Sequence, residues 1–256
     1  MKKVLILAPH PDDEIVGTCI IIKKFLDRKH DVSIFFLTHG VISKKEMWFF
    51  DRYKYEYSVK RRLKEAKKTL NELGIKKTFY QKIPSRTLKS NLQKSFYKLQ
   101  KILKKYNFDY LFTPAYEGGH QDHDTANFLS SLFKQKIKVF EYSEYNFFKN
   151  KINSNSFPKN NGSEITLNLT SDEVLLKKKL LNYYISEKKN LTYLKFDYES
   201  YRPLEKYDYS LPPHQGILFY RRFSLFSWHP RVDNTCPLNV CKLLTEFKKK
   251  NDNKTF

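Results

Sequence analysis

A short apolar segment followed at once by a dense polar turn constrains this chain most strongly. Residues 4–7 read Val-Leu-Ile-Leu, and residues 9–14 read Pro-His-Pro-Asp-Asp-Glu. An apolar run with β-branched residues is typical of a buried strand in a parallel sheet. The prolines cannot donate backbone hydrogen bonds, so the strand must end there. The pattern therefore places His10, Asp12 and Asp13 beyond the carboxyl end of a strand, where sites form in open α/β sheets.

A second polar cluster follows a second apolar strand. Residues 118–124 read Gly-Gly-His-Gln-Asp-His-Asp and come after a strand predicted at 110–114. Taken alone, the first turn could be a plain loop whose aspartate caps the next helix. Two histidine–aspartate clusters, each after a strand and before a helix, are difficult to explain as caps. An imidazole and two adjacent carboxylates at the edge of a sheet suit a divalent metal and a base.

Strand and helix patterns alternate along the first half of the chain. We expect strands at 4–7, 31–38, 78–83, 110–114 and 138–142, and helices at 16–28, 59–73, 89–106 and 122–134. Further on, we expect a loop at 146–162, a strand at 164–169 and a helix at 171–184. The alternation predicts parallel βαβ units with right-handed crossovers. The predicted fold class is α/β: a Rossmann-like, mostly parallel sheet with helices on both faces and an irregular C-terminal cap.

The charge of the chain raises the question of an anionic partner. The net charge is +21 at pH 7, and 39 of the 48 basic residues are lysine. Abundant Lys, Asn, Phe, Tyr and Ile with little Ala is a bias typical of an AT-rich genome, and there is no base-reading motif that would indicate nucleic-acid binding. We interpret most of the lysines as solvated. A phosphate-bearing substrate and an anionic membrane surface are the alternatives.

The start of the chain bears on its location. Its apolar stretch breaks at Pro9 and acidic residues follow, which is unlike a signal peptide. No apolar run has the roughly 18 residues that a membrane span needs. Three cysteines are too few and too scattered for a disulfide framework. We therefore expect a cytoplasmic protein, and the sequence does not indicate an oligomeric state.

The two motifs carry a family resemblance. Ala-Pro-His-Pro-Asp-Asp-Glu and His-Gln-Asp-His resemble the signature motifs of the PIG-L/LmbE-type N-acetylglucosaminyl deacetylases, Ala-His-Pro-Asp-Asp-Glu and His-Pro-Asp-His. Pro9 and Gln121 depart from that pattern, and neither change removes a metal-binding or acid–base group. Residues 62–65, Arg-Leu-Lys-Glu, are similar to the family's Arg-x-x-Glu helix. The resemblance covers about the first 140 residues well.

The resemblance implies a metal-dependent deacetylase that uses Zn²⁺ or another divalent metal such as Fe²⁺, Mn²⁺ or Co²⁺. His10, Asp13 and His123 would be the metal ligands, leaving an open position for water. Asp12 would be the general base. His120 would stabilise the oxyanion and protonate the departing amine. His120 and His123 could also both be ligands, which would close the site.

Further roles follow from the chemistry of the residues and, for Arg62, from the same resemblance. Asp122 would orient an imidazole, which we expect to be that of His120. Arg62 would lie near the substrate pocket, the alternative being a surface pair with Glu65. Gly118 and Gly119 would let the backbone approach a ligand.

The C-terminal part is predicted to close the site. Within a single domain spanning 1–256, residues 1–143 would form the core with both motifs, residues 144–247 would complete the sheet and cap the substrate, and residues 248–256 would be a frayed tail. His214, which follows two prolines, is a candidate to face the pocket.

The predicted function is removal of the N-acetyl group from an N-acetylated amino sugar or its conjugate, with release of acetate. The sequence does not indicate which sugar is the substrate. One alternative is a hydrolase of the same fold that acts on a different small amide. Another is a non-catalytic, basic nucleic-acid-binding protein. This alternative is disfavoured because every metal-binding and acid–base position of the motifs is occupied by a suitable residue.

Overall fold

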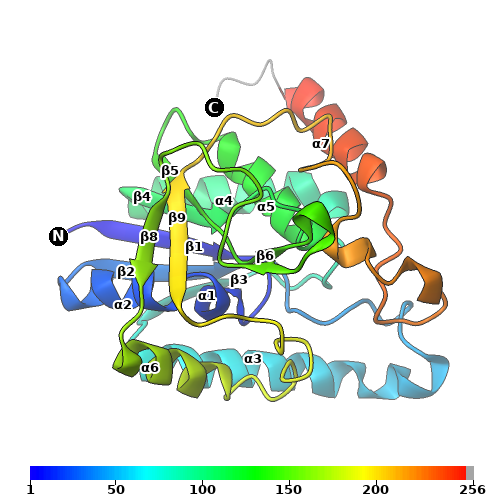
Figure 1. The fold of residues 1–256 in the computed structure, drawn as a ribbon, viewed down its shortest axis with the longest axis horizontal. Coiled ribbons are helices and arrows are strands. Elements are labelled where there is room, and N and C mark those ends of the chain that lie inside the picture. Colours follow the sequence, from blue (N-terminus) through cyan, green and yellow to red (C-terminus); the bar gives the residue numbers. More distant parts are fainter. Residues whose placement is uncertain (252–256) are drawn as a thin grey trace.

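The computed structural model describes residues 1–251 and contains one large mixed sheet (Figure 1). Its strand order is β3-β2-β1-β4-β5-β9-β8. The first five of these strands are parallel, and β9 and β8 continue the sheet in antiparallel fashion. The strands are β1 (Lys3–Ala8), β2 (Asp31–Phe36), β3 (Lys77–Tyr80), β4 (Tyr110–Pro114), β5 (Lys138–Tyr142), β8 (Ile165–Asn168) and β9 (Tyr198–Pro203). A separate small pair joins β6 (Tyr145–Asn146) and β7 (Asn153–Ser154).

Helices cover both faces of the sheet, as its alternating side chains require. Leu5 and Leu7 of β1 enter one apolar cluster, with α4 (Leu92–Tyr106), α5 (Gln121–Ser131) and α7 (Pro237–Asn251). Val4 and Ile6 point to the opposite face. There they pack with α1 (Asp13–Val16), α2 (Cys19–Asp27), α3 (Tyr55–Leu73) and α6 (Ser171–Leu181). The predicted α/β class, with helices on both faces, is confirmed.

The strand order places the two motifs together. β1 pairs in parallel with both β2 and β4, so the order of the sheet reverses between β1 and β4. The carboxyl ends of these neighbouring strands therefore open at the switch point where α/β proteins bind ligands. The first motif follows β1 and the second follows β4.

Several element boundaries agree with the sequence, and one predicted helix is divided. The strands at 110–114 and 138–142 are confirmed. The helix expected at 16–28 is instead α1 followed by α2, with Gly17 and Thr18 between them. A Cβ at Gly17 would lie 2.3 Å from the Tyr142 ring, so only glycine allows this close approach. Glu199 accepts hydrogen bonds from the backbone of Ile20 and Ile21 and so caps the start of α2.

The last quarter of the chain is more regular than expected. β9 joins the sheet beside β5, and α7 runs for 15 residues where the sequence indicated an irregular cap. The frayed tail predicted from residue 248 is wrong for residues 248–251, which belong to α7, and residues 252–256 lie outside the described part.

Short 3₁₀ helices are η1 (Phe49–Lys54), η2 (Leu88–Asn91), η3 (Phe148–Asn150), η4 (Phe219–Arg221) and η5 (Ser224–Phe226). Within residues 1–251, no helix combines the length and apolar character needed to cross a membrane.

Candidate active site

The first motif forms a tight turn at the carboxyl end of β1. Asp12 adopts a φ of 137°, a left-handed value that costs a non-glycine residue free energy. Its backbone carbonyl accepts hydrogen bonds of 2.9 Å from Ile15 and Val16, so the same residue starts α1. His10, Asp12 and Asp13 all line one cavity. Such strain is characteristic of sites where the surrounding structure fixes a side chain for function.

Three side chains from the two motifs converge on one point. His10 Nδ1 lies 3.2 Å from Asp13 Oδ2, and His123 Nε2 lies 3.2 Å from the same oxygen. The two nitrogens are 3.3 Å apart. Ligands about 2.0–2.2 Å from a tetrahedral ion are about 3.3–3.6 Å from one another. All three residues are buried, so their spacing and chemistry fit a divalent metal.

The electrostatic field at this cluster favours a positive charge. Burial alone would lower the pKa of His10, but the carboxylates of Asp13 and Asp122 raise it to about 10. A metal ion would supply that charge and displace the imidazole proton. The carboxylates that surround His10 thus make the cluster attractive to a cation, in agreement with the ligand spacing.

Asp122 supports His10, which corrects the prediction that it orients His120. Its Oδ2 lies 3.0 Å from His10 Nε2 and accepts a 2.6 Å hydrogen bond from the backbone of Arg86. Its other oxygen accepts from the backbone of Leu88 at 3.1 Å. These donors hold the carboxylate toward η2, 3.8 Å from His120 Nδ1. Because Asp122 occupies Nε2, the Nδ1 atom of His10 is the one left for a metal.

His120 stands beside the cluster, with one ring nitrogen already used. It is the N-cap of α5, and its Nδ1 accepts a 3.0 Å hydrogen bond from the backbone of Asp122. The proton of the neutral ring is therefore on Nε2. Burial lowers the pKa of His120 well below its usual value, and the charge of His10 adds to this effect. The prediction of a protonated His120 is thus replaced by a neutral imidazole that can donate one hydrogen bond.

His120 also belongs to a looser histidine cluster. Ligand atoms of His10, His120 and His123 lie within 4.8 Å of one another, as do those of Asp13, His123 and Glu144. The separations of 3.2–3.3 Å in the set of His10, Asp13 and His123 are shorter and closer to ligand spacing. The geometry therefore favours the two-histidine, one-carboxylate set.

Arg62 contacts the candidate base directly. Its Nη2 lies 2.9 Å from Asp12 Oδ1, and its Nη1 lies 2.7 Å from Glu187 Oε1. The surface pair with Glu65 is wrong, because Arg62 is buried and Glu65 pairs with Arg61 at 3.0 Å. Burial raises the pKa of Asp12 to about 6, while the charge of Arg62 acts to lower it. An aspartate with this pKa can accept a proton near neutral pH and give it back.

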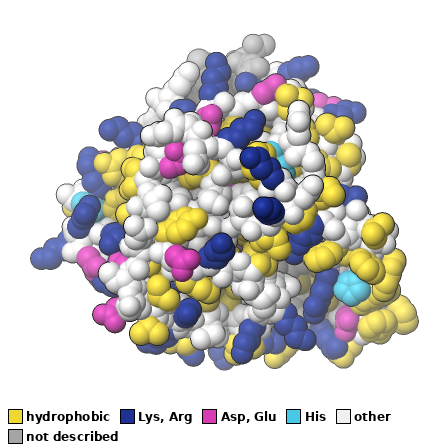
Figure 2. Space-filling model, viewed as in Figure 1, with side chains coloured by type: hydrophobic (Ala, Val, Ile, Leu, Met, Phe, Trp, Pro, Cys, Tyr) yellow, Lys and Arg dark blue, Asp and Glu magenta, His cyan; other side chains and the backbone are white. Residues whose placement is uncertain are grey.

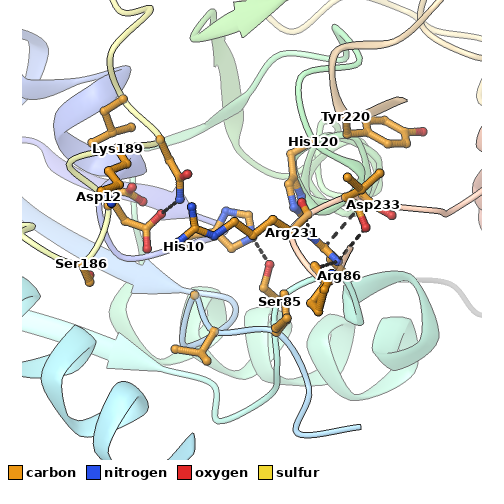
Figure 3. Close-up of a pocket in the computed structure, with 18 of the residues that line it drawn as sticks. His10, Asp12, Ser85, Arg86, His120, Ser186, Lys189, Tyr220, Arg231 and Asp233 are labelled. Atoms are coloured by element: carbon orange, nitrogen blue, oxygen red, sulfur yellow. Dashed lines mark hydrogen bonds and ion pairs between the residues drawn. The ribbon is translucent and has the colours of Figure 1, made fainter. Parts of the chain in front are cut away.

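These groups open into a cavity of about 910 Å³. Figure 3 shows His10 between Asp12 and Ser85, with Arg231 and Lys189 among the other labelled lining residues. The space is of the size that small-molecule sites occupy. Basic side chains in the lining, from several elements, are Arg61, Arg62, Arg86, Lys189, Arg222 and Arg231.

Three predicted substrate-binding residues have different places. Gly119 lines the cavity, and a Cβ there would lie 2.3 Å from the Tyr145 carbonyl oxygen. Gly118, with a φ of 71°, packs against Leu218 instead. The prediction that His214 faces the pocket is wrong for the described cavity. His214 packs against the Phe148 ring and bonds through Nδ1 to the Gln215 carbonyl, away from the cavity lining.

Two further residues at the site, Glu144 and Arg86, were not predicted from the sequence. Glu144 is fully buried 3.6 Å from His123 Nδ1, and within residues 1–251 its carboxylate oxygens have no hydrogen-bond partner. Burial raises its pKa well above the usual value. Arg86 ties the C-terminal part to the site by donating to the carbonyl oxygens of Pro230 and Arg231 at 2.9 and 2.8 Å. The position of Glu144 just after β5, at the same sheet edge, was the one available signal.

Fold and site together define a Rossmann-like α/β protein with a buried histidine–carboxylate cluster that suits a divalent metal, set at the switch point of its sheet. The chain belongs to the PIG-L family, because the family profile described as GlcNAc-PI de-N-acetylase matches residues 5–132. The resemblance stated from the two motifs is confirmed. No curated protein sequence matches the chain.

Solved structures share the fold at low sequence identity. A deacetylase of the teicoplanin biosynthesis pathway is 14% identical with a TM-score of 0.64, covering 81% of this chain and 99% of its own. The N,N'-diacetylchitobiose deacetylase of Pyrococcus horikoshii is 23% identical with a TM-score of 0.53, covering 83% and 84%. The 4-carboxy-2-hydroxymuconate hydratase of Pseudomonas putida is 13% identical with a TM-score of 0.53, covering 81% and 98%. At these identities the likeness shows the fold alone, and the hydratase illustrates that one fold hosts several chemistries.

Proposed function

We propose that this protein is a metal-dependent hydrolase that removes the N-acetyl group from an amino sugar or its conjugate and releases acetate. The observation that carries the proposal is the convergence of His10 Nδ1, Asp13 Oδ2 and His123 Nε2 within 3.2–3.3 Å, beside a buried Asp12. Family membership supports the amide as the bond that is cleaved. Zn²⁺ is the first candidate, and Fe²⁺, Mn²⁺ or Co²⁺ also suit this donor set.

The proposed ligands leave room for substrate. When bound by His10, Asp13 and His123, the metal would polarise the acetyl carbonyl and acidify a water molecule. Asp122 fixes the ring of His10 through Nε2, so that Nδ1 stays directed at the cluster. A neutral His120, with its proton on Nε2, would donate a hydrogen bond to the carbonyl oxygen as negative charge develops there.

Asp12 is the proposed acid–base group. It would take a proton from the attacking water while the oxygen–carbon bond forms, and deliver that proton to the amide nitrogen as the carbon–nitrogen bond breaks. The products are acetate and the free amine, and no oxidant or reductant is needed. A pKa of about 6 suits both transfers. Arg62, ion-paired to Asp12, holds the carboxylate in place and favours its ionised form. This assigns proton return to Asp12, because a neutral His120 has no spare proton.

The test measures acetate release from a panel of N-acetyl amino sugars and simple N-acetyl amides, with metal content measured on the same samples. We expect the wild-type protein to release acetate from an amino sugar. Asp12→Asn should keep the metal and lose about 10²–10⁴-fold in turnover. Asp27→Asn, on the exposed end of α2, is the matched control. Near-normal turnover of metal-loaded Asp12→Asn, or hydrolysis of simple amides alone, would overturn the proposal.

A further inference from the structure

Exposed apolar side chains gather at the mouth of the cavity. Within residues 1–251, eight of the seventeen large hydrophobic side chains that are exposed lie in two short segments, 49–57 and 223–228. We call these eight the aromatic rim: Phe49, Phe50, Tyr53, Tyr57, Phe223, Leu225, Phe226 and Trp228. Figure 2 shows hydrophobic side chains massed at the lower right of the molecule, and Figure 1 shows the two segments in that region. Exposed apolar clusters of this kind mark interaction sites.

The two halves of the rim form one surface although they are far apart in sequence. The ring of Trp48 lies 6.2 Å from that of Trp228 and 5.8 Å from that of Phe50. Tyr57, Phe223, Phe226 and Trp228 line the cavity as well, so the surface continues into the candidate active site.

The other four rim residues, Phe49, Phe50, Tyr53 and Leu225, do not line the described cavity and so are not available to a substrate inside it. Phe49 is 77% exposed and Leu225 is 91% exposed, and neither lines the cavity among the described residues. A sugar-stacking role explains aromatic faces within a pocket, whereas it does not explain an aliphatic side chain directed into solvent. These side chains are also not packed against the fold, because they remain exposed.

The excess of basic side chains around the aromatic rim indicates what kind of partner it binds. Residues 42–57 and 219–231 together hold seven basic and three acidic residues, within a chain of net charge +21. Two of those acidic groups have partners within the same segments: Asp51 pairs with Lys54 at 2.7 Å, and Glu46 accepts from Ser43 at 2.8 Å. A second copy of this chain would bring like charges together at a two-fold interface, which disfavours self-association through the rim. An anionic surface is the complementary partner.

We propose that the aromatic rim docks the protein on an anionic membrane surface, with the cavity mouth facing the lipid headgroups. Aromatic side chains prefer the interface between headgroups and acyl chains, and a partly buried Leu225 adds apolar contact. Basic residues beside the rim add attraction to anionic lipids. The proposal does not rest on the identity of the reaction, since it concerns a surface outside the catalytic groups.

The chain carries its own reporter for this test, because its two tryptophans, Trp48 and Trp228, both lie at the rim. We would titrate the protein with vesicles of phosphatidylcholine alone or mixed with phosphatidylglycerol. Tryptophan emission and co-sedimentation would be recorded together. The proposal predicts co-sedimentation and a blue shift with the anionic vesicles, both much weaker with phosphatidylcholine alone. No binding to anionic vesicles, or equal binding to both kinds, would overturn it.

Variants separate rim contact from general charge. Leu225→Glu should weaken vesicle binding roughly tenfold or more. Leu175→Glu is the matched control, since Leu175 is 64% exposed on α6 outside the rim. Lys44→Gln and Lys45→Gln should each cost about fivefold, whereas Lys104→Gln and Lys105→Gln at the end of α4 should cost much less. Equal losses in the rim variants and their controls would contradict the proposal.

Competing partners give different results in the same experiments. Single-stranded DNA, added at a charge matched to the vesicles, tests for nucleic-acid binding. If it displaces the protein from vesicles, and Leu225→Glu weakens binding to DNA as much as binding to vesicles, the proposal is overturned in favour of nucleic acid. A dimer in solution that Leu225→Glu dissociates would overturn it in favour of a second copy. Acetate release from a soluble substrate should be unchanged in Leu225→Glu, so failure of membrane docking and failure of the proposed reaction are distinguishable.

Discussion

Replacement of Arg62 by methionine should move the pH dependence of the reaction in a defined direction. The Arg62 Nη2 atom lies 2.9 Å from Asp12 Oδ1, and both side chains are buried. An opposite charge at this distance typically shifts a carboxyl pKa by about 1–3 units. Burial and Arg62 together set the pKa of Asp12 at about 6, so loss of the guanidinium should raise it to roughly 7–9.

The sign follows from the role of Asp12 as a base. Its ionised form is the active one, so the rate rises with pH through the pKa of this group. A higher pKa therefore removes activity at neutral pH and restores it in alkali. At pH 7 the ionised fraction, and with it kcat/KM, should fall by roughly twofold to a hundredfold.

The assay is kcat/KM for acetate release measured from about pH 5 to pH 10. Arg62→Lys, which retains a charge, should shift the acid limb less than Arg62→Met does. Thermal unfolding of each variant shows whether loss of this buried partner has also unfolded the protein. An acid limb that stays in place while KM rises at every pH would refute the reasoning, because Arg62 would then bind substrate without acting on Asp12.

Three further predictions concern metal support, transition-state contact and packing. Asp122→Asn should weaken metal affinity about 10–100-fold, measured by competition with a chelator, because it disturbs the hydrogen bond that orients His10; unchanged affinity would contradict this role. His120→Ala should lower kcat by roughly 10²–10³ with metal retained, whereas loss of the metal would make His120 a ligand. Gly17→Ala should destabilise the protein by about 1–3 kcal/mol in denaturant unfolding, because its Cβ would meet the Tyr142 ring at 2.3 Å; wild-type stability would refute the packing argument.

The sequence was sufficient to predict those elements and site residues whose position in the fold depends on one local pattern. The strands at 110–114 and 138–142 lie inside the sheet, and buried apolar residues such as Leu111, Phe112 and Val139 mark them in the sequence. The convergence of His10 with His123 followed from two motifs placed after parallel strands, and β1 and β4 are indeed neighbours. The turn residues after each strand, together with the pairing of β1 and β4, made this part of the site predictable.

Contacts between distant elements were not available from such patterns. Asp122 bonds to His10 because the backbone of Arg86 and Leu88, just before η2 and at its start, supplies donors from a separate segment. Arg62 reaches Asp12 because of how α3 lies against the turn after β1, which helical spacing to Glu65 does not reveal. β9 was missed because it is rich in polar and charged residues paired within the fold, such as the buried Arg202 with Glu141 at 2.7 Å. α7 carries an apolar spacing typical of a helix, at Val240, Leu244 and Phe247, so that element was predictable from the sequence. Tertiary partners, and not local propensity, stabilise β9.

Metal titration of the purified protein and its His123→Ala variant tests the central claim most directly. His30→Ala, a histidine outside the cluster, serves as the matched control. If His10, Asp13 and His123 hold one divalent ion, the wild-type and His30→Ala proteins should each bind one equivalent tightly. His123→Ala should lose most of that affinity while keeping its fold by circular dichroism. Tight binding of one equivalent by folded His123→Ala would contradict the proposed ligand set and the mechanism built on it.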